Sequence, residues 1–134
     1  QFIPATMEIH VLTMAACKVK FGTEVVLGQA IDKTLYKSLI THELAHALLW
    51  QNMKTANISR EMHEYFAYSI QLALLDDAYR EKIILANNVE AFSDDAEITE
   101  DYYLLNPTRF AVKSYLHFLA ANNGWDYLRS ILVK

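Results

Sequence analysis

The spacing of hydrophobic and polar residues changes near residue 30, which predicts a β-rich beginning and a helical remainder. Residues 6–13 alternate loosely and are rich in β-forming side chains, so they are predicted to form a strand. The apolar segments 17–21 and 24–27 are separated by Gly22 and are consistent with a hairpin or a further edge strand. Beyond this part, apolar residues recur at helical spacing.

The first long helix is predicted to follow Asp32 and to end at about residue 52. No Pro or Gly interrupts residues 29–51, and the Asp32 side chain is a suitable N-cap. Leucines supply the apolar surface that would hold this helix against the rest of the fold. They are Leu35, Leu39, Leu48 and Leu49.

A second helix is predicted from residue 60 to about 86, with Ser59 as its N-cap and a break at the Asn pair 87–88. Residues 90–101 contain six acidic side chains and no basic ones, which is typical of a solvated loop or helix start.

The last long helix is predicted to begin at Pro107, a residue favoured in the first turn of a helix. It would end at residues 122–124, where Gly124 would supply a positive φ. Residues 125–132 would then form a short closing helix.

Composition supports one domain over residues 1–134, with a β-rich part at 1–28 and a helical part at 32–134. The 134 residues are 53% hydrophobic and 21% charged, which is typical of a folded chain. Only 3 glycines and 2 prolines are present, which favours helices over a turn-rich β fold. The predicted class is therefore α+β, mainly α, with a small N-terminal sheet packed on the first long helix.

Charge and cysteine content exclude several kinds of protein. A net charge of −4 gives no support for nucleic-acid binding. Cys17 is the single cysteine, so neither an internal disulfide nor a Cys-rich zinc site is expected. No apolar run approaches the roughly 18 residues of a membrane span. The chain begins with Gln1, not Met, which suggests the mature form of an exported protein, periplasmic or secreted.

The first long helix contains the candidate metal-binding and catalytic residues, which form an HExxH motif at residues 42–46. His42 and His46 are four residues apart, so they lie on one face of the helix and can bind one metal ion. Glu43 lies beside that face, where its carboxylate can take a proton from a metal-bound water. Two imidazoles, one oxygen ligand and an open position are the usual arrangement of catalytic Zn²⁺.

The third ligand is expected from the second helix, which can return antiparallel to the first. Glu64 is favoured because its helix face continues through Ala67 and Tyr68, and the small Ala67 would allow close approach. Glu61, one turn earlier, and His63 are the alternatives.

A donor to a developing oxyanion would complete such a site. His117 is the first candidate for this catalytic role. Four tyrosines compete with it: Tyr68, Tyr102, Tyr103 and Tyr115.

Three segments carry a resemblance to known proteins. They are HELAHAL at residues 42–48, EYFAYSIQ at 64–71 and PTRFAVKSYLHF at 107–118. The first two resemble gluzincin-type HExxH zinc metallopeptidases, in which a Glu on the next helix is the third ligand. All three together resemble an uncharacterised family of exported bacterial proteins.

The resemblance implies that His42, His46 and Glu64 bind zinc and that Glu43 is the general base. It also brings His117 and Tyr68 forward as site residues. The chain departs from thermolysin-like enzymes because Tyr68 stands where they have an Asp that orients a zinc-bound His. It is also much shorter, and it has no recognisable second lobe for substrate.

The expected function is hydrolysis of peptide bonds in a peptide or protein substrate, with zinc as cofactor. The alternative is a non-catalytic module in which zinc joins the two helices and the surface binds a partner. Two further readings are a helical domain without metal and a cytosolic HExxH peptidase that cleaves repressors.

Overall fold

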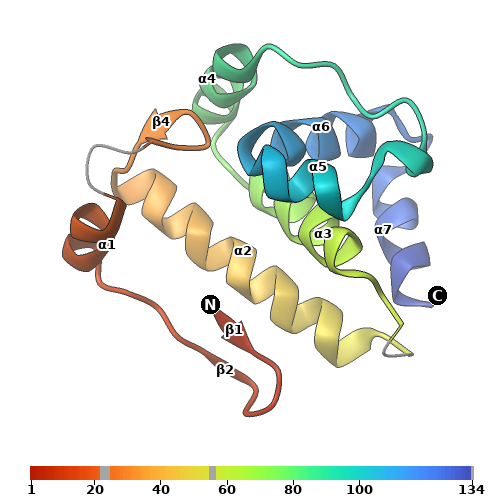
Figure 1. Ribbon diagram of the computed structural model, residues 1–134, viewed down its shortest axis with the longest axis horizontal. Helices are drawn as coiled ribbons and strands as arrows, with labels where there is room; N and C mark the ends of the chain where they lie inside the picture. The colour runs from red at the N-terminus through yellow and green to blue at the C-terminus, as the bar shows by residue number, and fades with distance from the viewer. Residues whose placement is uncertain (22–24, 55–56, 134) are drawn as a thin grey trace.

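The computed structural model describes residues 1–21, 25–54 and 57–133, and it is mainly helical with two small antiparallel strand pairs (Figure 1). The α+β, mainly α class is therefore confirmed. The elements are, in chain order, β1 (Phe2–Ile3), β2 (Glu8–Ile9), α1 (Met14–Phe21), β3 (Val25–Val26), β4 (Gln29–Ala30), α2 (Lys33–Asn52), α3 (Arg60–Ala73), α4 (Asp77–Asn87), the 3₁₀ helix η1 (Asp95–Glu97), α5 (Glu100–Leu105), α6 (Pro107–Ala120) and α7 (Gly124–Leu132).

Helix α2 begins and ends as the sequence predicts. The Asp32 side chain accepts a 2.8 Å hydrogen bond from the Leu35 amide and so satisfies one free donor of the first turn. The buried residues are spaced by three and four positions and therefore lie on one face. They are Leu35, Ser38, His42, Ala45 and Leu49. Leu48, predicted to join this apolar face, is instead 49% exposed.

Helix α3 lies at the centre of the protein, between α2 on one side and α6 on the other (Figure 1). Seven of its residues are buried, including Tyr65, Phe66 and Ala67. Ala67 is fully buried, so no large side chain at this position holds neighbouring helices apart. The site-bearing face of α2 is thus packed on the most deeply buried helix.

The predicted second helix over residues 60–86 is wrong in one respect, because it is two helices. Helix α3 ends at Ala73, and α4 begins at Asp77. Asp76 caps α4 by accepting a hydrogen bond from the Tyr79 amide. Arg80 donates to the Leu72 and Leu75 carbonyls at 3.2 and 2.9 Å, so carbonyls left free at the end of α3 are satisfied. The predicted break at the Asn pair is confirmed, since Asn88 has a φ of 43°.

The N-terminal part is less β-rich than predicted. Of residues 6–13, only Glu8–Ile9 form a strand, which pairs with β1 after a turn in which Met7 has a φ of 57°. Residues 17–21 belong to α1, whose first turn is capped by the Thr13 hydroxyl accepting from the Ala16 amide. The hairpin expectation is therefore wrong for 17–21, while Gly22 and residue 24 lie outside the described residues.

A hairpin does form from the described part of the second apolar segment. Strand β3 pairs antiparallel with β4, and Leu27 and Gly28 form the turn with φ of 54° and 77°. Positive φ at both central residues matches the right-handed twist of the strands that they join.

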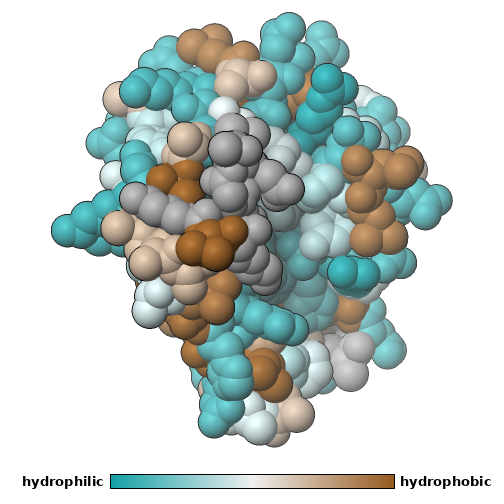
Figure 2. Space-filling view, turned by 60° about the vertical axis from the view of Figure 1, so that its left-hand side comes forward, coloured by the Kyte–Doolittle hydropathy of each residue, from teal (hydrophilic) through white to brown (hydrophobic). Residues whose placement is uncertain are grey.

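Exposed hydrophobic side chains are distributed over separate elements. The most exposed are Val19 on α1, Leu105 on α5 and Leu85 on α4, at 84%, 78% and 71%. On the face shown in Figure 2, hydrophobic residues likewise form separate patches among hydrophilic ones. Single exposed apolar residues of this kind are normal on protein surfaces and need no special explanation. Among the described residues, no helix is long and apolar enough to cross a membrane.

Gly124 has a different role from the one predicted. Helix α6 ends at Ala120, and Gly124 is the first residue of α7. A β-carbon at this position would lie 2.3 Å from the Phe118 carbonyl oxygen and 2.6 Å from the Phe118 ring. Glycine is needed here because α7 packs closely against the end of α6.

A Gly124→Ala variant is therefore expected to lose about 2 kcal/mol of unfolding free energy, the cost of forcing extra volume into a packed contact. The measurement is denaturant unfolding followed by circular dichroism. An Asn122→Ala variant, changed at an exposed position nearby, is the control. Wild-type stability in Gly124→Ala would contradict the packing explanation.

Candidate metal centre

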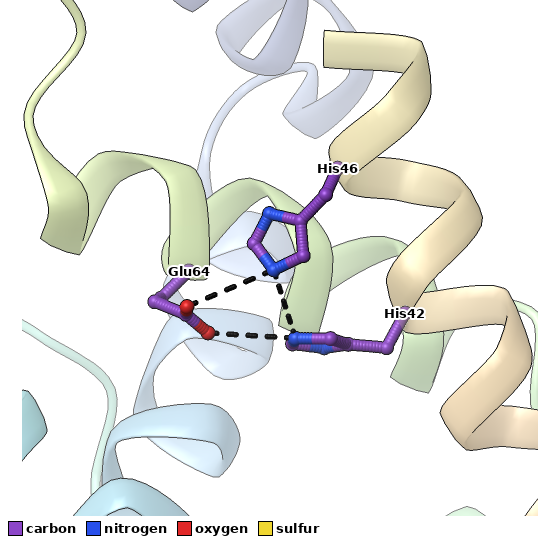
Figure 3. Close-up of side chains that lie close together, drawn as sticks. All are labelled: His42, His46 and Glu64. Atoms are coloured by element: carbon purple, nitrogen blue, oxygen red, sulfur yellow. Dashed lines mark hydrogen bonds and ion pairs between the residues drawn. The ribbon is translucent and has the colours of Figure 1, made fainter. Parts of the chain in front are cut away.

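Two neighbouring helices bring three potential metal ligands together. His42 and His46 lie one turn apart on α2, and Glu64 faces them from α3 (Figure 3). The two Nε2 atoms are 3.0 Å apart. The Glu64 carboxylate oxygens lie 3.4 Å from His42 Nε2 and 3.7 Å from His46 Nε2. The three side chains are therefore close enough to bind one metal ion.

The protonation states of these groups suit metal binding. Burial, with His42 beside it, lowers the pKa of His46 to about 4, so its imidazole is neutral at pH 7. Burial opposes ionisation of Glu64, but the His42 hydrogen bond and the nearby His46 outweigh it and lower the pKa of this carboxyl. A neutral imidazole and an ionised carboxylate are the forms that bind a metal.

A buried polar chain fixes the orientation of His42. Its Nδ1 donates to the Gln71 side-chain carbonyl at 3.0 Å, and the Gln71 amide donates to the Ser38 hydroxyl at 3.0 Å. Ser38 in turn donates to the Leu35 carbonyl at 2.7 Å. Because a carbonyl oxygen only accepts, Nδ1 carries a proton, and Nε2 is the nitrogen that faces Glu64 and His46 and that could bind a metal ion.

A Gln71→Leu variant is expected to bind metal about 10- to 100-fold more weakly, because the imidazole loses the partner that orients it. The measurement is competition with a chromophoric chelator. Ser114→Ala is a suitable control, because this buried hydroxyl on α6 has no hydrogen-bond partner among the residues that the structure describes. Unchanged metal affinity in Gln71→Leu would show that the amide does not support the ligand.

The ligand trio lies in an open cleft of about 760 Å³. Glu43 lines this cleft beside the ligands, as the HExxH spacing predicts. Aromatic side chains line it too, among them Trp50, Tyr68 and Tyr103. The N-terminal residues Gln1, Phe2 and Pro4 form part of its wall.

Among the third-ligand candidates, only Glu64 joins the described metal-binding group. His63 also lines the cleft, and its ring centre lies 6.2 Å from that of His46. Glu61 belongs neither to the ligand group nor to the cleft wall.

The structure does not bring His117 to the cleft. Its Nδ1 is 2.7 Å from the Tyr65 hydroxyl, and its Nε2 is 3.8 Å from Asp95. The ring also packs edge-on against Tyr127, whose hydroxyl donates to Asp95. His117 therefore joins α3, α6 and α7 and is not placed to stabilise an oxyanion.

Two of the competing tyrosines do reach the cleft. The Tyr68 ring lies 4.4 Å from that of His42, centre to centre, and Tyr103 is a second wall residue. Burial and the Glu64 carboxylate raise the pKa of both hydroxyls, so both stay protonated as donors. Tyr102 and Tyr115 are not among the wall residues and pack against Phe92 and Phe118.

Sequence reasoning missed two contacts of this site. Gln71 lies seven residues after Glu64, two helical turns along the same face, and this spacing was a usable signal. The second contact is the Phe2 main-chain N–H, which donates to Glu43 at 2.6 Å. No local sequence pattern predicts this hydrogen bond, because it joins residues 41 positions apart.

The fold and the site together define a small, mainly helical protein in which two histidines of an HExxH helix and a glutamate of the next helix are close enough to bind a metal ion. The chain belongs to a family of unknown function, DUF6639, whose model matches residues 1–133. No curated protein and no solved structure matches the chain.

Proposed function

We propose that this protein is a zinc-dependent metallopeptidase. The observation that carries the proposal is the convergence of His42, His46 and Glu64 in an open cleft, with Glu43 beside them. Two imidazoles and a carboxylate leave a coordination position free, as catalytic zinc sites require.

The donor set and its spacing support zinc in particular. Ligand atoms that surround a tetrahedral zinc ion at about 2.0–2.1 Å lie about 3.4 Å from one another. The two Nε2 atoms here are 3.0 Å apart, Glu64 Oε2 lies 3.4 Å from His42 Nε2, and Glu64 Oε1 lies 3.7 Å from His46 Nε2. Among the described residues the group contains no fourth His, Cys, Asp or Glu, which leaves room for water and substrate.

In this proposal, each step of hydrolysis is assigned to particular residues of the chain. Zinc, when bound, polarises the scissile carbonyl and acidifies the attacking water. Glu43 accepts a proton from that water and delivers it to the leaving amine. Tyr68 and Tyr103 carry protonated hydroxyls in the cleft, and either can donate to the developing oxyanion. Gln71 keeps His42 in the tautomer that binds metal.

The second candidate is a non-catalytic zinc module of the same fold, in which the ion joins α2 and α3. It is favoured by Tyr68, which stands where thermolysin-like enzymes have an orienting Asp. The Phe2 hydrogen bond, which already occupies Glu43, favours it as well. The open cleft beside the ligands favours the enzyme.

The deciding experiment is hydrolysis of a fluorogenic peptide library by zinc-loaded protein, with and without a chelator. Cleavage that stops on chelation and returns with zinc supports the peptidase. Stoichiometric zinc binding without cleavage of any library member or of unfolded casein supports the non-catalytic module.

A further inference from the structure

We propose that the N-terminal hairpin, residues 1–10, is a latch that holds the general base through the main-chain N–H of Phe2. Glu43 is engaged while this hydrogen bond stands, and it is freed when the hairpin moves away from α2. The functional consequence rests on the proposed peptidase activity, whereas the latch itself is a property of the chain.

The pairing of the hairpin explains why this N–H is available. Gln1 and His10 exchange both main-chain hydrogen bonds, at 2.7 and 2.8 Å. In an antiparallel pair the next residues along, Phe2 and Ile9, are then a non-hydrogen-bonded pair. The Phe2 N–H therefore points away from β2, and it meets the Glu43 carboxylate on α2.

Both carboxylate oxygens of Glu43 face the hairpin. Oε2 accepts from Phe2 at 2.6 Å, and the main-chain nitrogen of Gln1 lies 3.6 Å from Oε1. A hydrogen bond to an ionised carboxylate is stronger than one between neutral groups. The same oxygens are needed to take a proton from the attacking water, so the latched carboxylate is engaged elsewhere.

The hairpin also occupies space that a substrate would use. Phe2 and Pro4 form part of the wall of the cleft that contains His42 and Glu64.

The hairpin is held lightly, so it can open without unfolding the core. Each of residues 1–13 is exposed or only partly buried, and each strand is two residues long. Elements with few buried contacts open at low free-energy cost. Beyond the hairpin, the Tyr36 hydroxyl of α2 donates to the Leu12 carbonyl at 2.8 Å. This bond anchors the chain to α2 just after the hairpin.

A Phe2→Pro variant tests the latch, because proline removes the N–H and is tolerated at a strand position outside the ladder. A hydrogen bond to a charged group corresponds to about a tenfold or larger change in an equilibrium constant. Phe2→Ala is the matched control, because it removes the same aromatic side chain from the cleft wall but keeps the N–H. Zinc-loaded Phe2→Pro is therefore expected to cleave peptides about tenfold faster than zinc-loaded Phe2→Ala. A rate in Phe2→Pro equal to or below that of Phe2→Ala would overturn the latch.

Amide hydrogen exchange supplies a readout that needs neither zinc nor activity. In metal-free protein, Phe2→Pro and Glu43→Ala are both expected to raise the exchange of hairpin amides such as His10 about tenfold. Glu61→Ala, outside the cleft wall, is expected to leave exchange unchanged. Unchanged exchange in the first two variants refutes the latch, whatever the activity. Faster exchange in a protein that cleaves nothing supports the latch and refutes the peptidase.

Discussion

A Glu43→Gln variant is expected to bind zinc as wild type does and to lose about 100- to 10,000-fold in the rate of peptide hydrolysis. Glutamine has the size of glutamate, and Glu43 is not one of the three ligands, so the ligand group keeps its geometry. The amide cannot accept the proton of the attacking water, and general-base catalysis typically contributes a factor of this size. The loss of activity is measured as the hydrolysis rate under saturating zinc, and retained zinc binding is measured as the metal content after dialysis.

Glu81→Gln is the matched control, because Glu81 is an exposed carboxylate on α4 and does not line the cleft. It is expected to keep wild-type activity. Full activity in Glu43→Gln would refute the general-base role, while loss of zinc from that variant would show that Glu43 supports the ligands.

A Glu64→Ala variant is expected to lose metal affinity by more than the roughly 10- to 100-fold that follows removal of a group supporting a ligand. The carboxylate lies within 3.7 Å of both imidazoles and provides the only ionised oxygen of the trio. Without it, only the two imidazoles of this group remain to hold a divalent cation. Competition with a chromophoric chelator gives the affinity, and elemental analysis gives the stoichiometry.

The control for Glu64→Ala is Glu61→Ala, one turn earlier on the same helix. Glu61 is outside the ligand group, so this variant is expected to bind metal as wild type does. The reverse result, with metal lost in Glu61→Ala and kept in Glu64→Ala, would move the third ligand to position 61.

Local spacing was enough to anticipate the ligand group. The positions of His42 and His46 are fixed by one helical turn, and helix α2 has a side-chain cap and no internal breaker. Glu64 could be favoured over Glu61 because a small residue follows it on the same face. Ala67 is indeed fully buried in α3.

Features that depend on distant packing could not be anticipated in this way. His117 has the residue type of an oxyanion donor, but the packing of α6 and α7 turns it toward Tyr65 and Tyr127. The sequence around Gly124 resembles a helix end, but glycine is needed at this position because a β-carbon would collide with Phe118. The break between α3 and α4 depends on Arg80 reaching back to carbonyls of the preceding helix.

The three ligands come from helices that follow one another in the chain, within residues 42–64. Bringing together the ends of a segment of this length costs less chain entropy than joining ligands that are far apart in the chain, even before the protein has folded. The denatured chain is therefore expected to bind a divalent cation as well, although more weakly than the native protein does. Since binding to the unfolded ensemble subtracts from ligand-induced stabilisation, saturating metal will raise the melting temperature less than its affinity for the native protein implies.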